Sequence, residues 1–361
     1  MLRLNLQFFE VTAQIECESE ALQAALAQLY RPACKVQPGS PLVRYRIGPG
    51  VGVVQFVNGQ ARRLAWGGVS SWLAQALLFS SLTAQVRTHW LLHAAALRGP
   101  KGGLLLAGPS GSGKTTLALA LAQRGYGWLS DEVAAVERTR GNLVPFPRGA
   151  LVRPGTLRLL PNLRSQIELW PLREDDVVGC WHPPKPATSV PLRYVFLLSP
   201  AAEKGPTQVA VNCLPPTLAA KLADEPGLAG VEVTLRRGCV ILTWPRPLPP
   251  PALARLAQEC GKSGVLLLNV RPAPAEVDFS APPRVVPCPA SSVWLRLAEA
   301  AWNRPSLPFL TDGQDEQEEV MRFLWELAAM LRTVQGYQLH PGPLEDSVAL
   351  IEQVCGRAGV S

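Results

Sequence analysis

Residues 108–116, GPSGSGKTT, form a glycine-rich stretch that contains Lys114 and Thr115. Their spacing matches GxxxxGK[ST] in full, between an expected strand, GLLLA at 103–107, and an expected helix, TLALALAQ at 116–123. Glycines let backbone N–H groups surround a phosphate chain, and the helix N-terminus adds positive potential. The Lys114 ammonium can reach the β- and γ-phosphates, and the Thr115 hydroxyl can ligate magnesium.

This loop predicts a site for a nucleoside triphosphate. We expect ATP with Mg²⁺, although the loop alone is compatible with GTP as well. A glycine-rich turn without a ligand is the structural alternative, and the flanking strand and helix argue against it. The residues expected to hold the nucleotide are Gly108, Pro109, Ser110, Gly111, Ser112, Gly113, Lys114, Thr115 and Thr116.

Two acids, Asp131 and Glu132, follow the loop after one helix and one short strand, YGWLS at 126–130. They should therefore emerge at the carboxyl end of a strand beside the phosphate loop, the edge at which open α/β sheets bind ligands. One carboxylate can hold magnesium, and the other can accept a proton from an attacking hydroxyl. A capping role for Asp131 in the next element is the structural alternative.

Signatures of other nucleotide-binding classes are missing. The chain has no LSGGQ-like sequence of a transporter ATPase and no [NT]KxD sequence for guanine recognition. The sequence DEPG at 224–227 fits a DxxG pattern, but it follows a helical run, LAAKLA, instead of a strand. We interpret it as a turn.

Three segments together resemble the HPr serine kinase fold: HAAAL at 93–97, the GPSGSGKTT loop, and LSDE ending in Asp131 and Glu132. They look closest to the HPr-kinase-related proteins found beside bacterial peptide and polysaccharide gene systems. That fold is also related to phosphoenolpyruvate carboxykinase. The resemblance covers roughly residues 89–200 and implies a kinase-type P-loop.

The resemblance implies roles for further residues. His93 matches the family's histidine near the transferred phosphate, although a histidine in LLHAAAL is otherwise typical of a buried core. Asp131 and Glu132 match the acidic pair, of which one residue is the base and the other supports the metal. The family usually has two aspartates, so the glutamate at position 132 leaves open which acid is the base and which supports the metal. We favour Asp131 as the base, with Thr115 and Glu132 at the metal. PFPRGALVRPG loosely resembles the family's Arg-Gly loop and makes Arg148 a phosphate-contact candidate.

We therefore expect an ATP-dependent phosphotransferase that acts on a hydroxyl, with Ser of a peptide or small protein as acceptor. Two alternatives stay open. One is a nucleotide-binding or nucleotide-hydrolysing scaffold in peptide or polysaccharide maturation, and the other is a small-molecule kinase. The acceptor is the expected partner, and a homo-oligomer is compatible with the sequence.

The pattern of elements predicts an α/β protein in three parts. Residues 1–88 read as a small α/β unit, in which Ser19 caps a helix. Residues 89–303 alternate strands and helices, which favours a P-loop kinase-like domain with a mixed sheet. Residues 304–361 read as a helical tail, and the acidic run REDD at 173–176 as a solvated loop.

Composition limits the function classes. Of 361 residues, 47% are hydrophobic and 17% charged, which suits a buried core, and the net charge is +7. The basic residues are scattered, so we expect no nucleic-acid partner. We expect no membrane span, because the most apolar stretch is too polar and too short. The eight cysteines are dispersed and the start does not fit a signal peptide, so we expect a cytoplasmic protein.

Overall fold

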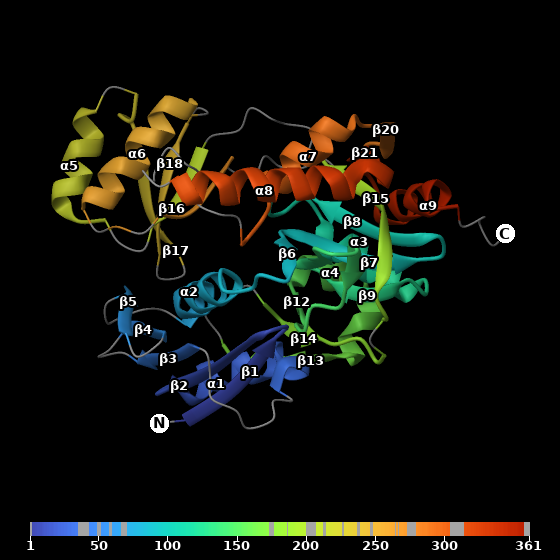
Figure 1. Ribbon diagram of the computed structural model, residues 1–361, viewed down its shortest axis with the longest axis horizontal. Coiled ribbons are helices and arrows are strands. Elements are labelled where there is room, and N and C mark those ends of the chain that lie inside the picture. The colour runs from blue at the N-terminus through green and yellow to red at the C-terminus, as the bar shows by residue number, and fades with distance from the viewer. Residues whose placement is uncertain are drawn as a thin grey trace.

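The chain is a mixed α/β protein with several sheets (Figure 1). The acidic run at 173–176 lies outside the residues described. The computed structural model describes residues 2–34, 43–48, 52–57, 60–65, 71–172, 177–185, 187–199, 207–211, 214–225, 227–236, 239–245, 248–263, 265, 267–272, 279–303 and 314–356.

The leading part of the chain forms a five-stranded sheet with the order β1-β2-β3-β4-β5. In it β2 and β3 run parallel and the other neighbours antiparallel. Alternation in VRYRIG buries Val43, Tyr45 and Ile47 beneath α1 and α2. As predicted, Ser19 caps α1, because its hydroxyl accepts the Leu22 N–H. The elements are β1 Leu2–Phe8, β2 Val11–Cys17, α1 Glu20–Leu29, η1 Arg31–Cys34, β3 Val43–Gly48, β4 Gly52–Val57, β5 Gln60–Ala65 and α2 Ser71–Thr83.

The largest sheet has the order β6-β10-β11-β15-β8-β7-β9, with β21 paired to β15 and β20 paired to β21. It is mixed as predicted, because β15 runs parallel to β8 and to β21 while the other pairs are antiparallel. Its strands are β6 His89–Leu92, β7 Ala94–Gly99, β8 Gly102–Ala107, β9 Gly127–Ser130, β10 Ala134–Glu137, β11 Asn142–Val144, β15 Val190–Leu198, β20 Arg284–Pro287 and β21 Gln335–His340.

Helices cover both faces of this sheet (Figure 1). Every residue of β8 is buried, as expected for a central strand between two helical layers. Leu104 and Leu106 face α3 and α9, whereas Leu105 faces α7 and α8. The helices are α3 Lys114–Gln123, α7 Ala290–Glu299, α8 Gln314–Met330 and α9 Leu344–Val354, with η4 Leu331–Thr333 after α8.

The C-terminal part differs from the predicted helical tail. Helices α8 and α9 lie there, but residues 335–340 form β21, which pairs in parallel with β15 inside the large sheet. The sequence QGYQLH has few of the branched residues that usually mark a strand, so its pattern did not predict one. Leu339 is fully buried and joins the core beneath α3 and α9.

Two smaller sheets complete the fold. One has the order β12-β14-β13 and lies between the loop after β11 and the start of β15. The other, β17-β18-β16-β19, follows β15 in the chain and has its own core around Leu218, Leu242 and Trp244. The sequence did not separate this second sheet from the larger one. The elements are β12 Ala150–Val152, α4 Pro154–Leu159, η2 Pro161–Ser165, β13 Ile167–Leu169, β14 Gly179–Trp181, β16 Thr207–Val211, α5 Pro216–Asp224, β17 Glu232–Arg236, β18 Cys239–Trp244, α6 Pro250–Lys262 and β19 Leu267–Pro272.

A helix can cross a bilayer only when it is both long and apolar. In the part of the chain that the structure describes, none is both long enough and apolar enough to traverse one.

Candidate functional site

One edge of the large sheet gathers the predicted site residues. Strand β7 lies between β8 and β9 and pairs antiparallel with both. The carboxyl ends of β8 and β9 and the amino end of β7 therefore meet at the same edge. This edge carries Gly108 after β8, Asp131 after β9 and His93 before β7. The sequence predicted this edge for Asp131, but it did not predict that β7 would separate β9 from β8.

The loop 108–113 has the backbone that its glycines allow. Gly111 and Gly113 have φ values of +87° and +91°, which side chains with a Cβ rarely adopt. A Cβ on Gly108 would lie 2.9 Å from Leu198, so β15 leaves no room there for a larger residue. The Ser112 hydroxyl donates to the Pro109 carbonyl at 2.8 Å and closes the loop from inside.

Lys114 is held inside this loop. Its Nζ donates to the carbonyls of Gly108 at 2.7 Å and Pro109 at 3.0 Å, and the residue is buried. Burial lowers the pKa of Lys114, while the negative charges of Glu132 and Asp131 act in the opposite direction. The ammonium is therefore already at the loop where a phosphate chain would replace the carbonyls as its partners.

The two threonines after Lys114 connect α3 to other elements. Thr115 donates from its Oγ1 to Asp131 Oδ2 at 3.2 Å, which links the loop to the end of β9. The hydroxyl of Thr116 pairs with that of Thr156 in α4 at 2.9 Å. Thr115 thus faces the carboxylates, whereas Thr116 joins two helices and does not turn toward them.

Asp131 is buried and both of its oxygens have partners. Its residue is only 3% exposed; Oδ2 accepts from Thr115, and Oδ1 lies 3.4 Å from Arg148 Nη1. Burial raises the pKa of Asp131 to about 6, and the charge of Glu132 also raises it, while Arg148 and Thr115 act to lower it. Arg148 and Thr115 therefore stabilise the ionised form of Asp131 less than burial and Glu132 destabilise it.

Glu132 is more open and pairs with His93. Its Oε1 lies 3.3 Å from His93 Nε2, and the Glu132 side chain is 36% exposed. Burial acts to raise the pKa of Glu132, but the hydrogen bond from His93 and the charges of Arg148 and Lys114 outweigh it and lower the pKa. The ring of His93 also lies 5.5 Å from that of Trp302. His93 is therefore at the site, where the resemblance placed it.

Arg148 reaches the site from the loop between β11 and β12. Its side chain is 11% exposed and pairs with Asp131. Burial acts to lower the pKa of Arg148, but the acidic groups around it, Asp131 first and then Tyr30 and Glu132, together outweigh burial and raise the pKa. A second arginine, Arg153 at the start of α4, has a charge that adds to the lowering of the Lys114 pKa.

The residues at this edge fit a magnesium nucleotide. Magnesium prefers oxygen ligands and commonly takes one or two protein oxygens together with nucleotide phosphates. Thr115 and Asp131 offer such oxygens side by side, and Lys114 and Arg148 offer positive charge beside them. Among the described residues no group of three or more His, Cys, Asp or Glu could hold a metal by itself.

Sequence reasoning missed two residues that contact the site residues. Thr156 lies against α3, and the Tyr30 hydroxyl, at the C-terminal end of α1, lies near Arg148. Tyr30 lies more than a hundred residues before Arg148 in the chain, so no local pattern connects the two. Neither residue belongs to a motif.

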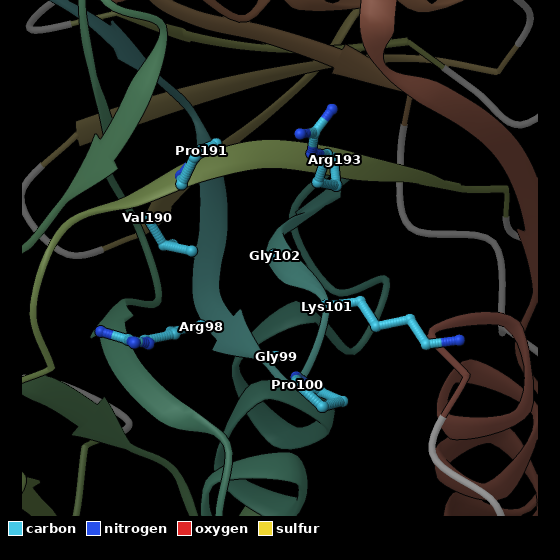
Figure 2. A pocket seen from close by; sticks show the side chains of 8 residues that line it. All are labelled: Arg98, Gly99, Pro100, Lys101, Gly102, Val190, Pro191 and Arg193. Carbon is cyan, nitrogen blue, oxygen red and sulfur yellow. The ribbon is translucent and has the colours of Figure 1, made fainter.

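A hollow of about 430 Å³ lies at the opposite end of β8. Figure 2 shows the arginine and lysine side chains of this hollow pointing in different directions, so they do not converge on one ligand. We do not assign it to the site. Its lining residues are Arg98, Gly99, Pro100, Lys101, Gly102, Val190, Pro191 and Arg193.

Comparison of the chain with protein-family models gives no match, and no curated protein matches its sequence.

Proposed function

We propose that the chain is an ATP-dependent phosphotransferase that moves the γ-phosphate of a magnesium nucleotide to a hydroxyl group. The observation that carries the proposal is the contact between Thr115 and Asp131, which brings the phosphate loop and the acidic pair into one site. The acceptor class, Ser of a peptide or small protein, follows from the resemblance to HPr-kinase-related proteins.

In this proposal the loop and Lys114 bind the phosphate chain. Backbone N–H groups of 108–113 and the N-terminus of α3 surround the phosphates, and Lys114 turns from its two carbonyl partners to the β- and γ-phosphates. Thr115 and Asp131 are the residues that would hold Mg²⁺. Bound there, the metal would neutralise charge on the phosphate oxygens beyond what Lys114 and Arg148 supply.

The geometry favours Glu132 as the base. Both oxygens of Asp131 already have partners and the residue is buried, so an acceptor hydroxyl has poor access to it. Glu132 contacts His93 through one oxygen, and its side chain is more exposed than that of Asp131. We therefore reverse the division favoured from the sequence: Asp131 serves the metal, and Glu132, oriented by His93, accepts the proton. A weak base is sufficient, because the transition state of phosphoryl transfer is loose.

Two variants test this division. Glu132→Gln keeps the loop and Asp131, so it should bind magnesium ATP normally and lose transfer by about a hundredfold or more. Asp131→Asn should weaken the magnesium-dependent part of nucleotide binding. Both are measured with a fluorescent ATP analogue and with γ-labelled ATP and an acceptor peptide encoded by a neighbouring gene. The opposite pattern would restore Asp131 as the base.

One surface feature favours the alternative of a nucleotide-dependent scaffold. Met321 and Trp325, one turn apart on α8, are 52% and 68% exposed, and large exposed apolar side chains often mark binding surfaces. A scaffold would release phosphate from ATP without any acceptor. A small-molecule kinase would label a sugar or amino alcohol in an acceptor panel but not peptides.

A further inference from the structure

The leading part of the chain, which carries no motif, reaches into the candidate site. Tyr30 caps the C-terminal end of helix α1 and is buried, and its hydroxyl lies close enough to Arg148 for the guanidinium to act to lower its pKa. One residue earlier, the Leu29 carbonyl accepts the N–H of Gly149 at 2.7 Å. The end of α1 therefore contacts both the side chain of Arg148 and the backbone beside it.

The Tyr30 ring is fixed from the other side by aromatic packing. Its ring lies edge-on to Phe8 with centroids 5.2 Å apart, and Phe8 stacks on Phe146 at 5.5 Å. Phe146 belongs to the same loop as Arg148 and donates its N–H to the carbonyl of Leu129 in β9. The hydroxyl of Tyr30 is thus held at one place relative to the end of β9.

Further contacts join α1 to the small sheet that follows the Arg148 loop. The carbonyl of Gln28 lies 2.8 Å from His182 Nε2, and the Gln28 side chain donates to the carbonyls of Glu168 and Leu169. Arg31 forms a two-pronged ion pair with Glu168. The position of α1 is therefore determined on both sides of Tyr30.

We propose that Tyr30 is a positioning residue that holds the Arg148 guanidinium against Asp131. The leading part of the chain then contributes to the geometry of the site. A guanidinium has five N–H donors and a buried one needs several acceptors to stay in one orientation. Asp131 supplies one acceptor and Tyr30 another. Burial raises the pKa of Tyr30 to about 12, so the hydroxyl stays neutral and leaves the charge of Arg148 to Asp131 and the phosphate. The proposal rests on the proposed phosphotransferase function.

The test compares two substitutions that each remove one buried hydroxyl from the leading part of the chain, Tyr30 at the end of α1 and Tyr45 in β3. Tyr30→Phe removes the acceptor for Arg148. The control, Tyr45→Phe, removes a hydroxyl that is bonded to Ser81 at 2.9 Å and Gln55 at 3.1 Å, away from the site. Both substitutions remove only a buried hydroxyl, so an effect seen in Tyr30→Phe and not in Tyr45→Phe reports on Arg148 and not on a general loss of stability.

The first readout does not depend on activity. Full-length proteins are treated with phenylglyoxal, and modification of Arg148 is followed by mass spectrometry. We expect Arg148 to react about tenfold faster in Tyr30→Phe, because its guanidinium loses one of its buried partners, and at the wild-type rate in Tyr45→Phe. An unchanged rate in Tyr30→Phe overturns the proposal, whatever the enzyme does.

The second readout is steady-state transfer from ATP. We expect kcat of Tyr30→Phe to fall about tenfold with KM for ATP nearly unchanged, since the loop still holds the nucleotide. Faster modification of Arg148 in Tyr30→Phe with an unchanged kcat also overturns the proposal. In that case Tyr30 would hold Arg148, but the position of Arg148 would not matter for the reaction. A wild-type protein that transfers no phosphate to any acceptor refutes the proposed function instead, and the modification rates still show whether Tyr30 holds Arg148.

Discussion

Removal of the Asp131 carboxylate should change how stability depends on pH. Asp131 is buried between Thr115 and Arg148, and its pKa is raised to about 6 in the folded chain from an ordinary value of 3.8. The unfolded chain therefore loses this proton at lower pH than the folded chain does. The contribution of Asp131 to stability is fully present below about pH 3.8 and is lost as the pH rises through about 6.

The size of the effect follows from the two pKa values. Each pKa unit corresponds to about 1.4 kcal/mol, so the metal-free wild type should lose about 3 kcal/mol through Asp131 over the whole range. About 2 kcal/mol of this loss should fall between pH 4 and pH 7. Asp131→Asn carries no such proton, so its free energy of unfolding should rise relative to that of the wild type by the same amount over this interval. The attraction between ionised Asp131 and Arg148 is already included in the folded pKa of about 6, so it adds no separate contribution to this slope.

The assay is urea unfolding at intervals from pH 4 to pH 7, with a chelator to exclude divalent cations. Asp224→Asn is the matched control, because it removes an exposed carboxylate at the end of α5. The pH dependence of Asp131→Asn is compared with that of this control as well as with that of the wild type. Parallel curves for Asp131→Asn and the wild type would refute the reasoning, since Asp131 would then titrate alike in the folded and unfolded chains.

Three further substitutions test the loop and its supports. Lys114→Met should weaken ATP binding and lower transfer by about a hundredfold or more, because no other residue of the loop supplies an ammonium; unchanged nucleotide affinity by titration would contradict this. Gly113→Ala should cost about 1–2 kcal/mol in urea unfolding, because the φ of +91° strains any residue with a Cβ. Thr116→Val should lower stability by about 1 kcal/mol through the lost bond to Thr156 with little change in ATP affinity, and a large loss of affinity would instead place Thr116 at the nucleotide.

Local patterns were sufficient to predict much of the large sheet. The strand at 103–107, the glycine loop and the helix after it appear as β8, the loop and α3, because each has a short-range signal. The strand β21 has no such signal. It forms because β15 offers a free edge and Leu339 enters the core, and both are tertiary effects. The separate sheet β17-β18-β16-β19 is also decided by which strands pair, and single-strand patterns do not encode pairing.

The site shows the same division. Lys114, Thr115 and Asp131 could be brought together from sequence because only one helix and one short strand separate the loop from Asp131. The choice of His93 as a site residue needed the resemblance, because LLHAAAL by itself fits a core strand, and its pairing with Glu132 was not predicted. Tyr30 could not be found, since its contact with Arg148 depends on how the leading sheet docks against the loop after β11.

The charges at this edge predict that the proposed nucleotide binding requires a divalent cation. Without a ligand, the acids Asp131 and Glu132 face the cations Lys114 and Arg148, so the site residues nearly balance one another. A triphosphate adds several negative charges to this balance. Lys114 can turn to the phosphates only by leaving Gly108 and Pro109, and Arg148 is committed to Asp131. Mg²⁺ beside Thr115 and Asp131 would share in neutralising the Asp131 carboxylate, so that Arg148 could turn to the phosphates. Metal and nucleotide should therefore each strengthen binding of the other.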